Sequence, residues 1–247
     1  MASITSKRAL VVIAGAGAGL SSAIARRFGQ TYDVVVISRS QSSVDPIVSD
    51  LKARGTIAHG MTADVTQPES LASVFEKISA LGQPTAAAIY NVSSPFSRQP
   101  FSELSLAEFE ASLSGSPKGA FNFAQRVLPL LLATEYNDMS LPPTLLFTGA
   151  TASFKGNAYM AAFAPAKWAL RGLAQVLARE YGPQGVHIGC VNIDGVIESE
   201  RSREYLKDVV DGKISPSAAA EAYWHLHTQP RSAWTWEMDV RPWSEKW

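Results

Sequence analysis

The feature that most constrains this chain is the alternation of short apolar runs with segments of helix length. Strands are expected at 9–14, 32–38, 56–63, 85–91, 144–149, 186–192 and 234–240. The first six runs are almost continuously apolar, which is typical of parallel strands covered on both faces. Between them lie amphipathic segments such as 19–29 and 166–180. This order predicts βαβ units and an α/β fold with a doubly wound, Rossmann-type parallel sheet of about seven strands.

The length of the chain, 247 residues, suits one large α/β domain and is too short for two. We therefore expect residues 1–247 to form a single domain. Thr66 followed by Pro68, and Ser215 followed by Pro216, predict helix starts, because proline is tolerated in the first turn of a helix.

Charge and hydropathy exclude several classes of partner. Lys and Arg (22) balance Asp and Glu (22), and no run of like charges occurs. This argues against binding to nucleic acid or to an anionic membrane surface. No stretch reaches the roughly 18 apolar residues of a membrane span, and no signal-peptide cleavage site is evident, so we expect a cytoplasmic protein. The one cysteine, Cys190, lies in an apolar run, which favours a buried strand thiol over a nucleophile.

A glycine-rich turn joins the first expected strand to the first helix. It contains Gly15, Gly17 and Gly19 and continues into Leu20 and Ser21. Glycines let the backbone turn tightly and approach a pyrophosphate, while the helix N-terminus offers N–H groups and positive dipole potential. Any tight turn between a strand and a helix can be rich in glycine, but here the strand and the helix that the motif requires are both present. The turn predicts a dinucleotide site whose pyrophosphate is held by free amides of residues 15–20.

Arg39 follows the second strand, between Ser38 and Ser40. Sites for NAD usually have an acidic residue here, which binds the ribose hydroxyls. A guanidinium suits a 2′-phosphate because it binds phosphate in a fork geometry. We therefore expect NADP(H) as the cofactor; the alternative is a solvated loop arginine.

Candidate ligand-binding residues also follow the third and fourth strands, at the edge where open α/β sheets bind ligands. Asp64 and Val65 follow the third strand, and Asn91 follows the fourth. We expect all three to contact the cofactor, although Asp64 could instead form part of a helix cap with Thr66.

Taken together, the motifs resemble those of the short-chain dehydrogenase/reductase family over essentially the whole chain. The glycine motif of the family corresponds to Ala14–Leu20 and ends in Ser21 in place of the last glycine. The acidic residue for the adenine corresponds to Asp64, and the family's NNAG motif is reduced to residues 90–93. The YxxxK motif corresponds to residues 163–167, and PGxxxT to residues 194–199. From the resemblance we expect Gly195 and Ile197 to contact the cofactor.

The catalytic residues that the resemblance implies are largely replaced. Family members use an Asn-Ser-Tyr-Lys set, in which the tyrosine transfers the proton, the serine polarises the substrate oxygen and the lysine holds the nicotinamide ribose. Here the lysine is Lys167, while the tyrosine position is Phe163, the serine position is Ala150 and the asparagine position is Ser116. General acid–base catalysis supplies about 10²–10⁴-fold, so another proton donor is required for carbonyl reduction.

Tyr159 is the candidate donor nearest in sequence, so Lys167 and Tyr159 are the expected catalytic residues. Pro165 is best tolerated in the first turn of a helix, so the helix should begin near residue 162 and Tyr159 should lie on the incoming loop. The alternative is an ordinary half-buried loop tyrosine. Lys167 is expected to be buried rather than on the surface, because its neighbours Ala164 and Ala166 are small.

Several further groups could replace the missing hydroxyls or the acid. They are Thr148, Thr151 and Ser153 near the vacated serine, Ser93 and Ser94 beside Asn91, and Asp194 at the sixth strand end. No metal is expected, because His225 and His227 do not share one helical face. His59 and His187 are strand residues for which the sequence offers no partners.

Residues 196–232 are expected to form a helical insert over the cofactor, which in the family is a substrate lid. Tyr205, Tyr223 and Trp224 would then line an apolar pocket for a hydrophobic substrate.

The last strand differs from the others because Trp234, Trp236, Met238 and Val240 alternate with polar residues, as in an edge strand buried on one face. Four of the six tryptophans lie in the final 14 residues. They could close the core or form a subunit interface, and we expect a homo-oligomer, either dimer or tetramer.

Three functions fit these observations. The first is an NADP(H)-dependent oxidoreductase with a non-standard proton donor, acting on a carbonyl or alcohol of a small hydrophobic substrate. The second is non-redox chemistry on the same scaffold, such as that of an isomerase or cyclase. The third is a non-catalytic cofactor-binding protein. We favour the first, because hydride transfer is supplied by the cofactor and the protein mainly positions it.

Overall fold

The structure is a computed structural model in which residues 8–92, 95–134 and 141–246 are described. A parallel seven-stranded sheet of order β3-β2-β1-β4-β5-β6-β7 runs through it. The strands are β1 (Leu10–Ala14), β2 (Asp33–Ser38), β3 (Ala58–Thr62), β4 (Thr85–Tyr90), β5 (Thr144–Ala150), β6 (His187–Ile193) and β7 (Glu237–Val240). The predicted single-domain, doubly wound α/β fold is confirmed.

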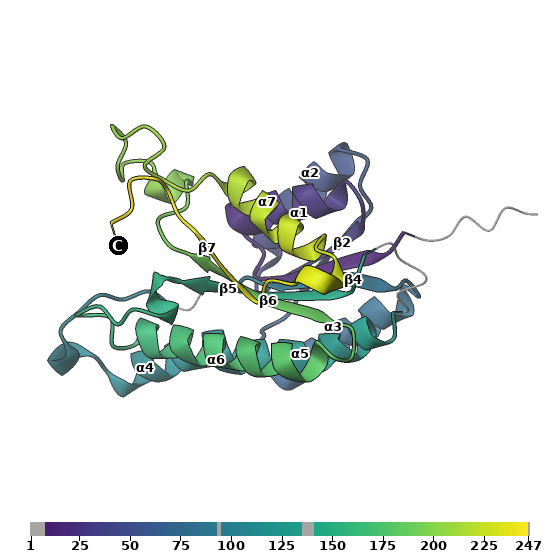
Figure 1. Cartoon of the computed structure of the whole chain (residues 1–247), viewed down its shortest axis with the longest axis horizontal. Helices are drawn as coiled ribbons and strands as arrows, with labels where there is room; N and C mark the ends of the chain where they lie inside the picture. Colours follow the sequence, from purple (N-terminus) through teal and green to yellow (C-terminus); the bar gives the residue numbers. More distant parts are fainter. Residues whose placement is uncertain (1–7, 93–94, 135–140, 247) are drawn as a thin grey trace, which may run out of the picture.

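Helices cover both faces of the sheet (Figure 1). The helices α1 (Leu20–Gly29), α2 (Gln41–Ala53) and α7 (Pro216–His227) lie on one face, and α3 (Pro68–Ala80), α4 (Leu106–Leu113), α5 (Gly119–Leu132) and α6 (Phe163–Tyr181) lie on the other. Two separate apolar cores result, because alternate residues of each strand point to opposite faces. In β1, for example, Val12 packs with the α3, α5 and α6 side and Val11 with the α1, α2 and α7 side.

The strand order reverses at β1, which pairs with β2 on one side and with β4 on the other. Loops after β1 and β4 therefore leave the sheet in opposite directions and open a crevice at its carboxyl edge, the usual ligand position in this fold. The residues that follow β1, β2, β4, β5 and β6 lie along this edge. The fold thus brings together segments that are up to about 180 residues apart in the chain.

Proline positions set the starts of three helices as predicted. Pro68 and Pro216 are the first residues of α3 and α7. Helix α6 begins at Phe163 with Ala162 as its N-cap, so Pro165 lies in the first turn, where no intrahelical hydrogen bond to its nitrogen is needed.

The edge strands differ from the sequence-based expectation. In β3 only Ala58 is fully buried, since β2 is the one strand that pairs with it in the described sheet. Full coverage on both faces is therefore wrong for this strand. In β7, Met238 and Val240 pack against one core as expected. The opposite face is also partly covered, because Glu237 turns toward Arg171 of α6.

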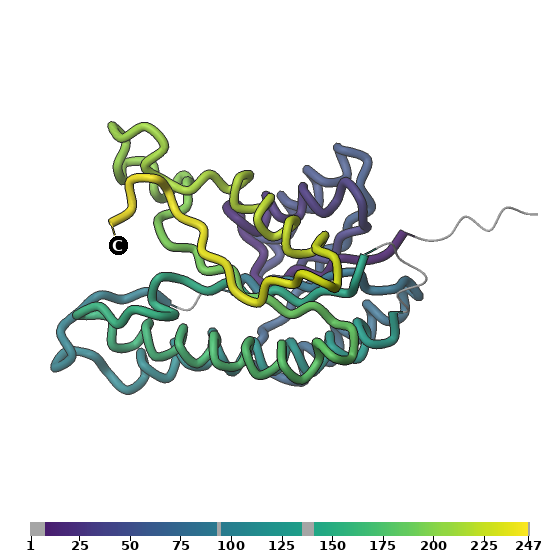
Figure 2. Tube along the Cα trace, viewed as in Figure 1, coloured from purple at the N-terminus to yellow at the C-terminus, as the bar shows by residue number. Residues whose placement is uncertain are grey.

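The segment after β6 divides into two parts (Figure 2). Residues 198–215 form a loop with a short 3-10 turn, and this loop lies beside the C-terminal segment, where Trp243 Nε1 donates to the carbonyl of Val210 at 3.1 Å. The remainder is α7, whose buried face packs on α1. Tyr223 of α7 is completely buried, while the ring of Trp224 lies under the guanidinium of Arg27 and meets Phe28 edge-on. These two aromatic residues therefore belong to the core rather than to a substrate pocket.

No helix in the described part of the chain is long and apolar enough to cross a membrane.

Candidate active site

The glycine-rich turn after β1 divides into a structural half and an open half. The amides of Gly15 and Ala16 both donate to the carbonyl of Ile37 in β2, at 2.9 and 3.0 Å. These two groups are therefore not free for a ligand, and the expectation of free amides throughout residues 15–20 is wrong at its first two positions. Within the described chain, no hydrogen bond uses the amides of residues 17–19.

Glycine serves different purposes at Gly15 and at Gly17 and Gly19. Gly15 has a φ of +93°, and a Cβ there would lie 2.3 Å from the carbonyl oxygen of Asn91. The turn thus requires glycine for its own conformation. A Cβ at Gly17 or Gly19 would meet no atom within 4 Å. Open space above these two residues, next to the start of α1, fits a pyrophosphate held by backbone N–H groups.

Ser21 is a residue whose role the sequence did not indicate. Its buried hydroxyl donates to the carbonyl of Gly15 at 2.6 Å and accepts from Asn91 Nδ2 at 2.7 Å. Asn91 is itself held in place because its backbone N–H donates to the carbonyl of Ala14. The hydroxyl therefore joins the turn after β1 to the end of β4. The replacement of the family's last glycine by serine was the only signal for this contact.

Arg39 and Asp64 lie near each other beyond the ends of β2 and β3. Arg39 is exposed and makes no hydrogen bond or ion pair with any other described residue, so its guanidinium is available to a ligand. Asp64 Oδ1 accepts from the backbone N–H and the hydroxyl of Thr66, at 2.9 and 2.8 Å. The hydrogen bond from the Thr66 amide, with the nearby Arg39 adding a smaller effect, lowers the pKa of Asp64. Asp64 therefore forms a turn with Thr66 rather than a helix cap, because the N-cap of α3 is Gln67 and has no side-chain cap hydrogen bond. A cofactor role for Asp64 stays a prediction.

The remaining predicted cofactor residues lie along the same edge. Val65 is buried, and its carbonyl accepts from Asn122 Nδ2 at 3.0 Å. Gly195 has a φ of +151°, and a Cβ there would lie 2.8 Å from Pro242, so the turn after β6 requires glycine. Ile197 is half-buried and bridges to Ile214.

Lys167 points inward from α6 and is only 4% exposed, as expected from its small neighbours. Its Nζ donates to the carbonyl of Thr148 in β5 at 3.1 Å and lies 5.7 Å from the ring of Phe163. Burial lowers the pKa of this ammonium to about 8. Phe163 has no ionisable group and packs edge-on against Phe96. The residues at the tyrosine and lysine positions are therefore adjacent, but only the lysine can exchange a proton.

Ser116 lies in a π-helical turn, Ser114–Lys118, between α4 and α5. Such turns are rare and are frequent at functional sites. The side chain of Ser116 is completely buried, and its Oγ makes no hydrogen bond in the described structure. This turn packs against α6, the helix that carries Lys167. A buried hydroxyl without a protein partner fits a site that is completed by a ligand or an ordered water.

The hydroxyl groups that could replace the missing serine already have partners. Thr148 Oγ1 bonds to the hydroxyl of Tyr223 at 2.7 Å inside the core, and Ser153 Oγ accepts from the amide of Ala150 at 3.0 Å. Thr151 donates its hydroxyl to Asp194. The hydroxyl proton of Thr151 is therefore committed to Asp194, whereas Ser153 uses its oxygen as an acceptor and keeps its own hydroxyl proton unassigned among the described contacts. Ser93 and Ser94 lie outside the described residues.

Tyr159 lies on the loop before α6, as predicted. It is 55% exposed, and its φ of +68° is unusual for a residue other than glycine. Its carbonyl accepts from the amide of Gln99. A strained backbone of this kind is common at functional sites, but nothing in the structure yet ties this hydroxyl to the other site residues.

Asp194 follows β6 directly and is nearly buried. Its Oδ1 accepts from Thr151, and its Oδ2 pairs with Arg241 Nη1 at 3.3 Å. Both carboxyl oxygens of Asp194 are therefore already engaged by protein donors rather than turned to a substrate. The suggestion that it replaces the tyrosine as an acid therefore loses support.

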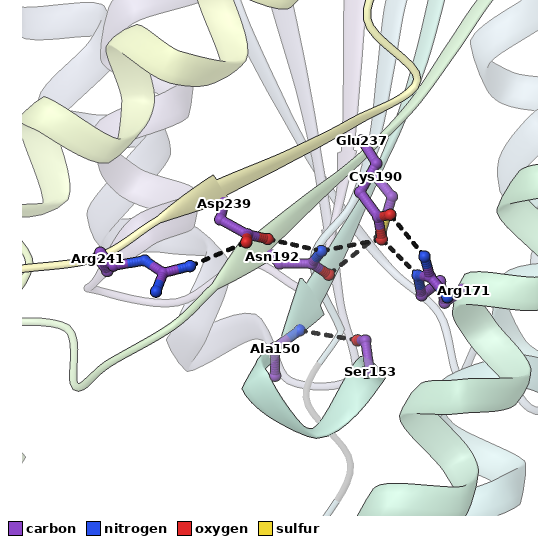
Figure 3. Close-up of polar contacts among 8 residues, drawn as sticks. All are labelled: Ala150, Ser153, Arg171, Cys190, Asn192, Glu237, Asp239 and Arg241. Atoms are coloured by element: carbon purple, nitrogen blue, oxygen red, sulfur yellow. Dashed lines mark hydrogen bonds and ion pairs between the residues drawn. The ribbon is translucent and has the colours of Figure 1, made fainter. Parts of the chain in front are cut away.

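Arg241 belongs to a longer polar network beside the site (Figure 3). It also donates to Asp239 at 2.9 Å, and Asn192 donates to both Asp239 and Glu237 at 3.0 Å. Glu237 in turn accepts two hydrogen bonds from Arg171 of α6, at 2.5 and 2.7 Å. Gly149 makes room for Asn192, since a Cβ there would lie 2.0 Å from its side-chain oxygen. The network links β7 and α6 to the end of β6.

His187, His227 and the one cysteine are structural. His227 is completely buried between Tyr32 and Thr144, and burial lowers its pKa to about 3, so it stays neutral. His187, for which the sequence offered no partner, bonds to the carbonyl of Thr235. Burial raises the pKa of Cys190 to about 12, which makes it a poor nucleophile. Among the described residues, no group of three or more His, Cys, Asp or Glu could hold a metal ion.

These features define an α/β protein whose ligand site lies at the carboxyl edge of a doubly wound sheet, with a glycine-rich turn and a buried lysine. Residues 9–209 match the family described as short chain dehydrogenase. The chain therefore belongs to the short-chain dehydrogenase/reductase family, a family of oxidoreductases.

Similar proteins cover the whole chain. The uncharacterized oxidoreductase Lmo0432 of Listeria monocytogenes is 25% identical, with 99% of this chain and 100% of that protein aligned. A crystal structure of a short-chain dehydrogenase from Rhodopseudomonas palustris has 29% identity and a TM-score of 0.78, covering 95% of this chain and 99% of that one. A metagenomic short-chain oxidoreductase in complex with NADP has 21% identity and a TM-score of 0.79, covering 96% and 98%.

Proposed function

We propose that this protein is an NADP(H)-dependent oxidoreductase that acts on a carbonyl or alcohol of a small hydrophobic substrate and uses a proton donor other than the family's tyrosine. The proposal is carried by two observations at the same edge of the sheet: the Arg39 guanidinium after β2, which pairs with no other described residue, and the open amides of residues 17–19 after β1. A 2′-phosphate and a pyrophosphate are the two groups that these donors suit.

The residues of the crevice would hold the cofactor as follows. Arg39 would bind the 2′-phosphate, and Gly17, Gly19 and the first turn of α1 from Leu20 would bind the pyrophosphate. Gly15 and Asn91 would shape the turn, while Asp64 and Val65 would flank the adenine. In the second half, Lys167, Gly195 and Ile197 would hold the nicotinamide riboside. The bound cofactor supplies hydride transfer, and the protein supplies orientation.

Two groups remain as proton donors, Lys167 and Tyr159. Lys167 is buried and has a pKa of about 8, so its ammonium can give up a proton near neutral pH. Tyr159 lies on an exposed loop, from which it would have to reach the substrate oxygen. We assign the proton transfer to Lys167 and a substrate-binding or accessory role to Tyr159. The exposed, apolar Phe96 beside Phe163 supports a hydrophobic substrate, with residues 198–215 as the lid.

Isothermal titration calorimetry with NADPH, NADP⁺ and NADH on folded protein tests the cofactor. NADPH is expected to bind at least about tenfold tighter than NADH. The oxidoreductase activity is tested by following NADPH absorbance against a panel of apolar aldehydes and ketones. Absence of heat with every pyridine nucleotide would remove the proposal.

The replacement of the family's tyrosine by Phe163, with the Thr151 hydroxyl already committed to Asp194, favours a second candidate, a protein that binds the cofactor without redox turnover, whether a non-redox enzyme or a sensor. NADPH binding with no oxidation by any carbonyl, combined with new carbonyl reductase activity in the double variant Phe163→Tyr and Ala150→Ser, would support it.

Two further expectations complete the proposal. The exposed Phe121, Trp168 and Val176 on α5 and α6 support a homo-oligomer, which light scattering can measure. A cytoplasmic location stays a prediction from the sequence.

A further inference from the structure

Asp194 lies at the edge of the sheet where the second half of a dinucleotide would be bound. The two mononucleotide halves of a doubly wound sheet lie on either side of the switch point. With the 2′-phosphate at the end of β2 and the pyrophosphate after β1, the nicotinamide half belongs over the carboxyl ends of β4, β5 and β6. Asp194 is the first residue after β6, and its amide donates to the carbonyl of Val240 at 2.8 Å, so its position is fixed.

The carboxylate is paired with a cation and largely excluded from water. Its oxygens accept from Thr151 and pair with Arg241, and its side chain is only 7% exposed. Charges that are excluded from water interact over longer distances than charges on the surface.

Arg241 does not cancel this negative charge completely. Its guanidinium is shared, because it also pairs with Asp239 at 2.9 Å. Two carboxylates thus surround one guanidinium. The opposing charge on the sheet side is the ammonium of Lys167, which donates to the carbonyl of Thr148.

We propose that the carboxylate of Asp194 makes this site bind the oxidised, positively charged nicotinamide more tightly than the neutral, reduced one. This inference rests on the proposed function, since it requires that a nicotinamide cofactor occupies the crevice. The two forms of the cofactor differ by one positive charge on the ring, so a fixed negative charge nearby discriminates between them. NADP⁺ and NADPH make the same contacts through the adenosine phosphate and the pyrophosphate, so these contacts do not affect the ratio of the two dissociation constants.

The preference has a direct consequence for hydride transfer. A site that binds the oxidised form more tightly lowers the reduction potential of the bound couple, by about 30 mV for each tenfold in the ratio. The bound, reduced cofactor is then a stronger hydride donor than the free one. The same preference slows release of the oxidised cofactor after reduction of a substrate.

The test is calorimetric titration of the full-length protein with NADP⁺ and with NADPH under identical buffer and salt. The wild-type protein is expected to bind NADP⁺ about fivefold tighter than NADPH, and Asp194→Asn to reduce this ratio to about one. Asp239→Asn is the matched control, because it removes the same charge from the same guanidinium at a more exposed position, and its ratio is expected to stay within about twofold of wild type. Melting temperatures of the three proteins show that the variants are folded.

Each outcome is informative. A wild-type protein that binds NADPH as tightly as or more tightly than NADP⁺ would overturn the inference, and this measurement needs no variant. An unchanged ratio in folded Asp194→Asn, or an equal loss of the ratio in Asp239→Asn, would also overturn it. In all three cases the cofactor binds, so the proposed function stands. Absence of binding by either form removes the proposed function and this inference together.

Discussion

Asn91 at the end of β4 donates its side-chain amide to the hydroxyl of Ser21 at 2.7 Å. The same hydroxyl donates to the carbonyl of Gly15 at 2.6 Å, so one buried serine fixes the turn after β1 against the next strand of the sheet. The contact lies at the switch point, where the two halves of the crevice meet. A hydroxyl here does what glycine at this position cannot, because it holds the turn through a side chain.

The first prediction concerns this contact. Ser21→Ala removes one acceptor and one donor and leaves the Asn91 amide without its partner, so NADPH affinity is expected to fall about tenfold, equivalent to about 1.4 kcal/mol. Calorimetry measures it. Ser22→Ala is the control, because Ser22 is equally buried in the same helix but makes no side-chain hydrogen bond among the described contacts. Equal affinities in Ser21→Ala and wild type would contradict the assignment.

The second prediction concerns the 2′-phosphate. Arg39→Ala is expected to weaken NADPH binding by about tenfold or more while NADH binding is unchanged, because a guanidinium–phosphate contact contributes about 1.5–3 kcal/mol. Lys52→Ala, which removes an exposed cation at the far end of α2, should change neither affinity. Parallel titrations with both nucleotides provide the comparison. An equal loss for NADPH and NADH would show that Arg39 does not contact the 2′-phosphate.

The third prediction concerns the buried ammonium. The pKa of Lys167 is about 8 in the folded protein and 10.5 unperturbed, so between these values the unfolded chain binds more protons and stability rises with pH. Lys167→Met removes the cost of burying the charge, about 3 kcal/mol, and loses one hydrogen bond, about 1 kcal/mol. The variant should be about 1–2 kcal/mol more stable at pH 7.

Urea denaturation measures this effect, and the advantage of Lys167→Met should shrink steadily from pH 8 to pH 10. The same variant is expected to bind the cofactor more weakly, since the ribose contact is lost. Lower stability than wild type at pH 7, with no change in the difference at higher pH, would mean that the ammonium is well solvated.

The fourth prediction concerns the ion pair between Arg171 and Glu237, which connects α6 to the edge strand with two hydrogen bonds. Glu237→Gln is expected to lower the free energy of unfolding by about 1–3 kcal/mol at pH 7. The hydrogen bonds from Arg171 lower the pKa of Glu237, so the stabilisation is present above the ordinary range of a glutamate and is lost as the pH falls through the lowered pKa.

A double-mutant cycle with Arg171→Gln isolates this pair. A coupling energy near zero at pH 7, or one that persists unchanged to pH 2, would show that the pair is not stabilising.

The fifth prediction separates the two proton-donor candidates. With whichever carbonyl substrate the NADPH absorbance screen identifies, Tyr159→Phe is expected to lower kcat less than about threefold, whereas Lys167→Met lowers it at least about 100-fold, the smaller end of general acid catalysis. Tyr181→Phe, at the C-terminal end of α6 and so at the opposite end of that helix from Phe163, is the control for Tyr159→Phe. A large loss of kcat in Tyr159→Phe at unchanged KM would assign the proton transfer to Tyr159 instead.

Much of the fold could be predicted from the sequence because its signals are local. Continuous apolar runs mark strands that are covered on both faces, and Pro165 places the start of α6 within one residue of its observed position. The small neighbours of Lys167 predicted its burial correctly, since alanines allow a helix to pack closely. The signal failed at β3 and on the polar face of β7, where coverage depends on which elements come to lie beside a strand.

The candidate site shows the same division. The turn at residues 15–19 and the cation after β2 could be recognised from their order along the chain. The sequence could not show that the carbonyl of Ile37 accepts from two of these amides, or that Thr151 donates to Asp194. Each of these contacts joins residues that lie far apart in the chain. The core position of Tyr223 could not be predicted either, because its hydroxyl bonds to Thr148 where α7 packs on β5.

The sequence by itself determined the parallel α/β sheet, the position of its crevice and the donors that face it, because strand order and turn chemistry follow from short-range patterns. Only the tertiary structure decided which polar groups remain free for chemistry. A hydrogen-bond donor is available to a ligand only if no protein acceptor already binds it. Whether one does depends on the positions of both groups in the folded chain. In this protein the pairing commits the hydroxyl of Thr151 to Asp194 and leaves the buried hydroxyl of Ser116 without a protein partner among the described residues.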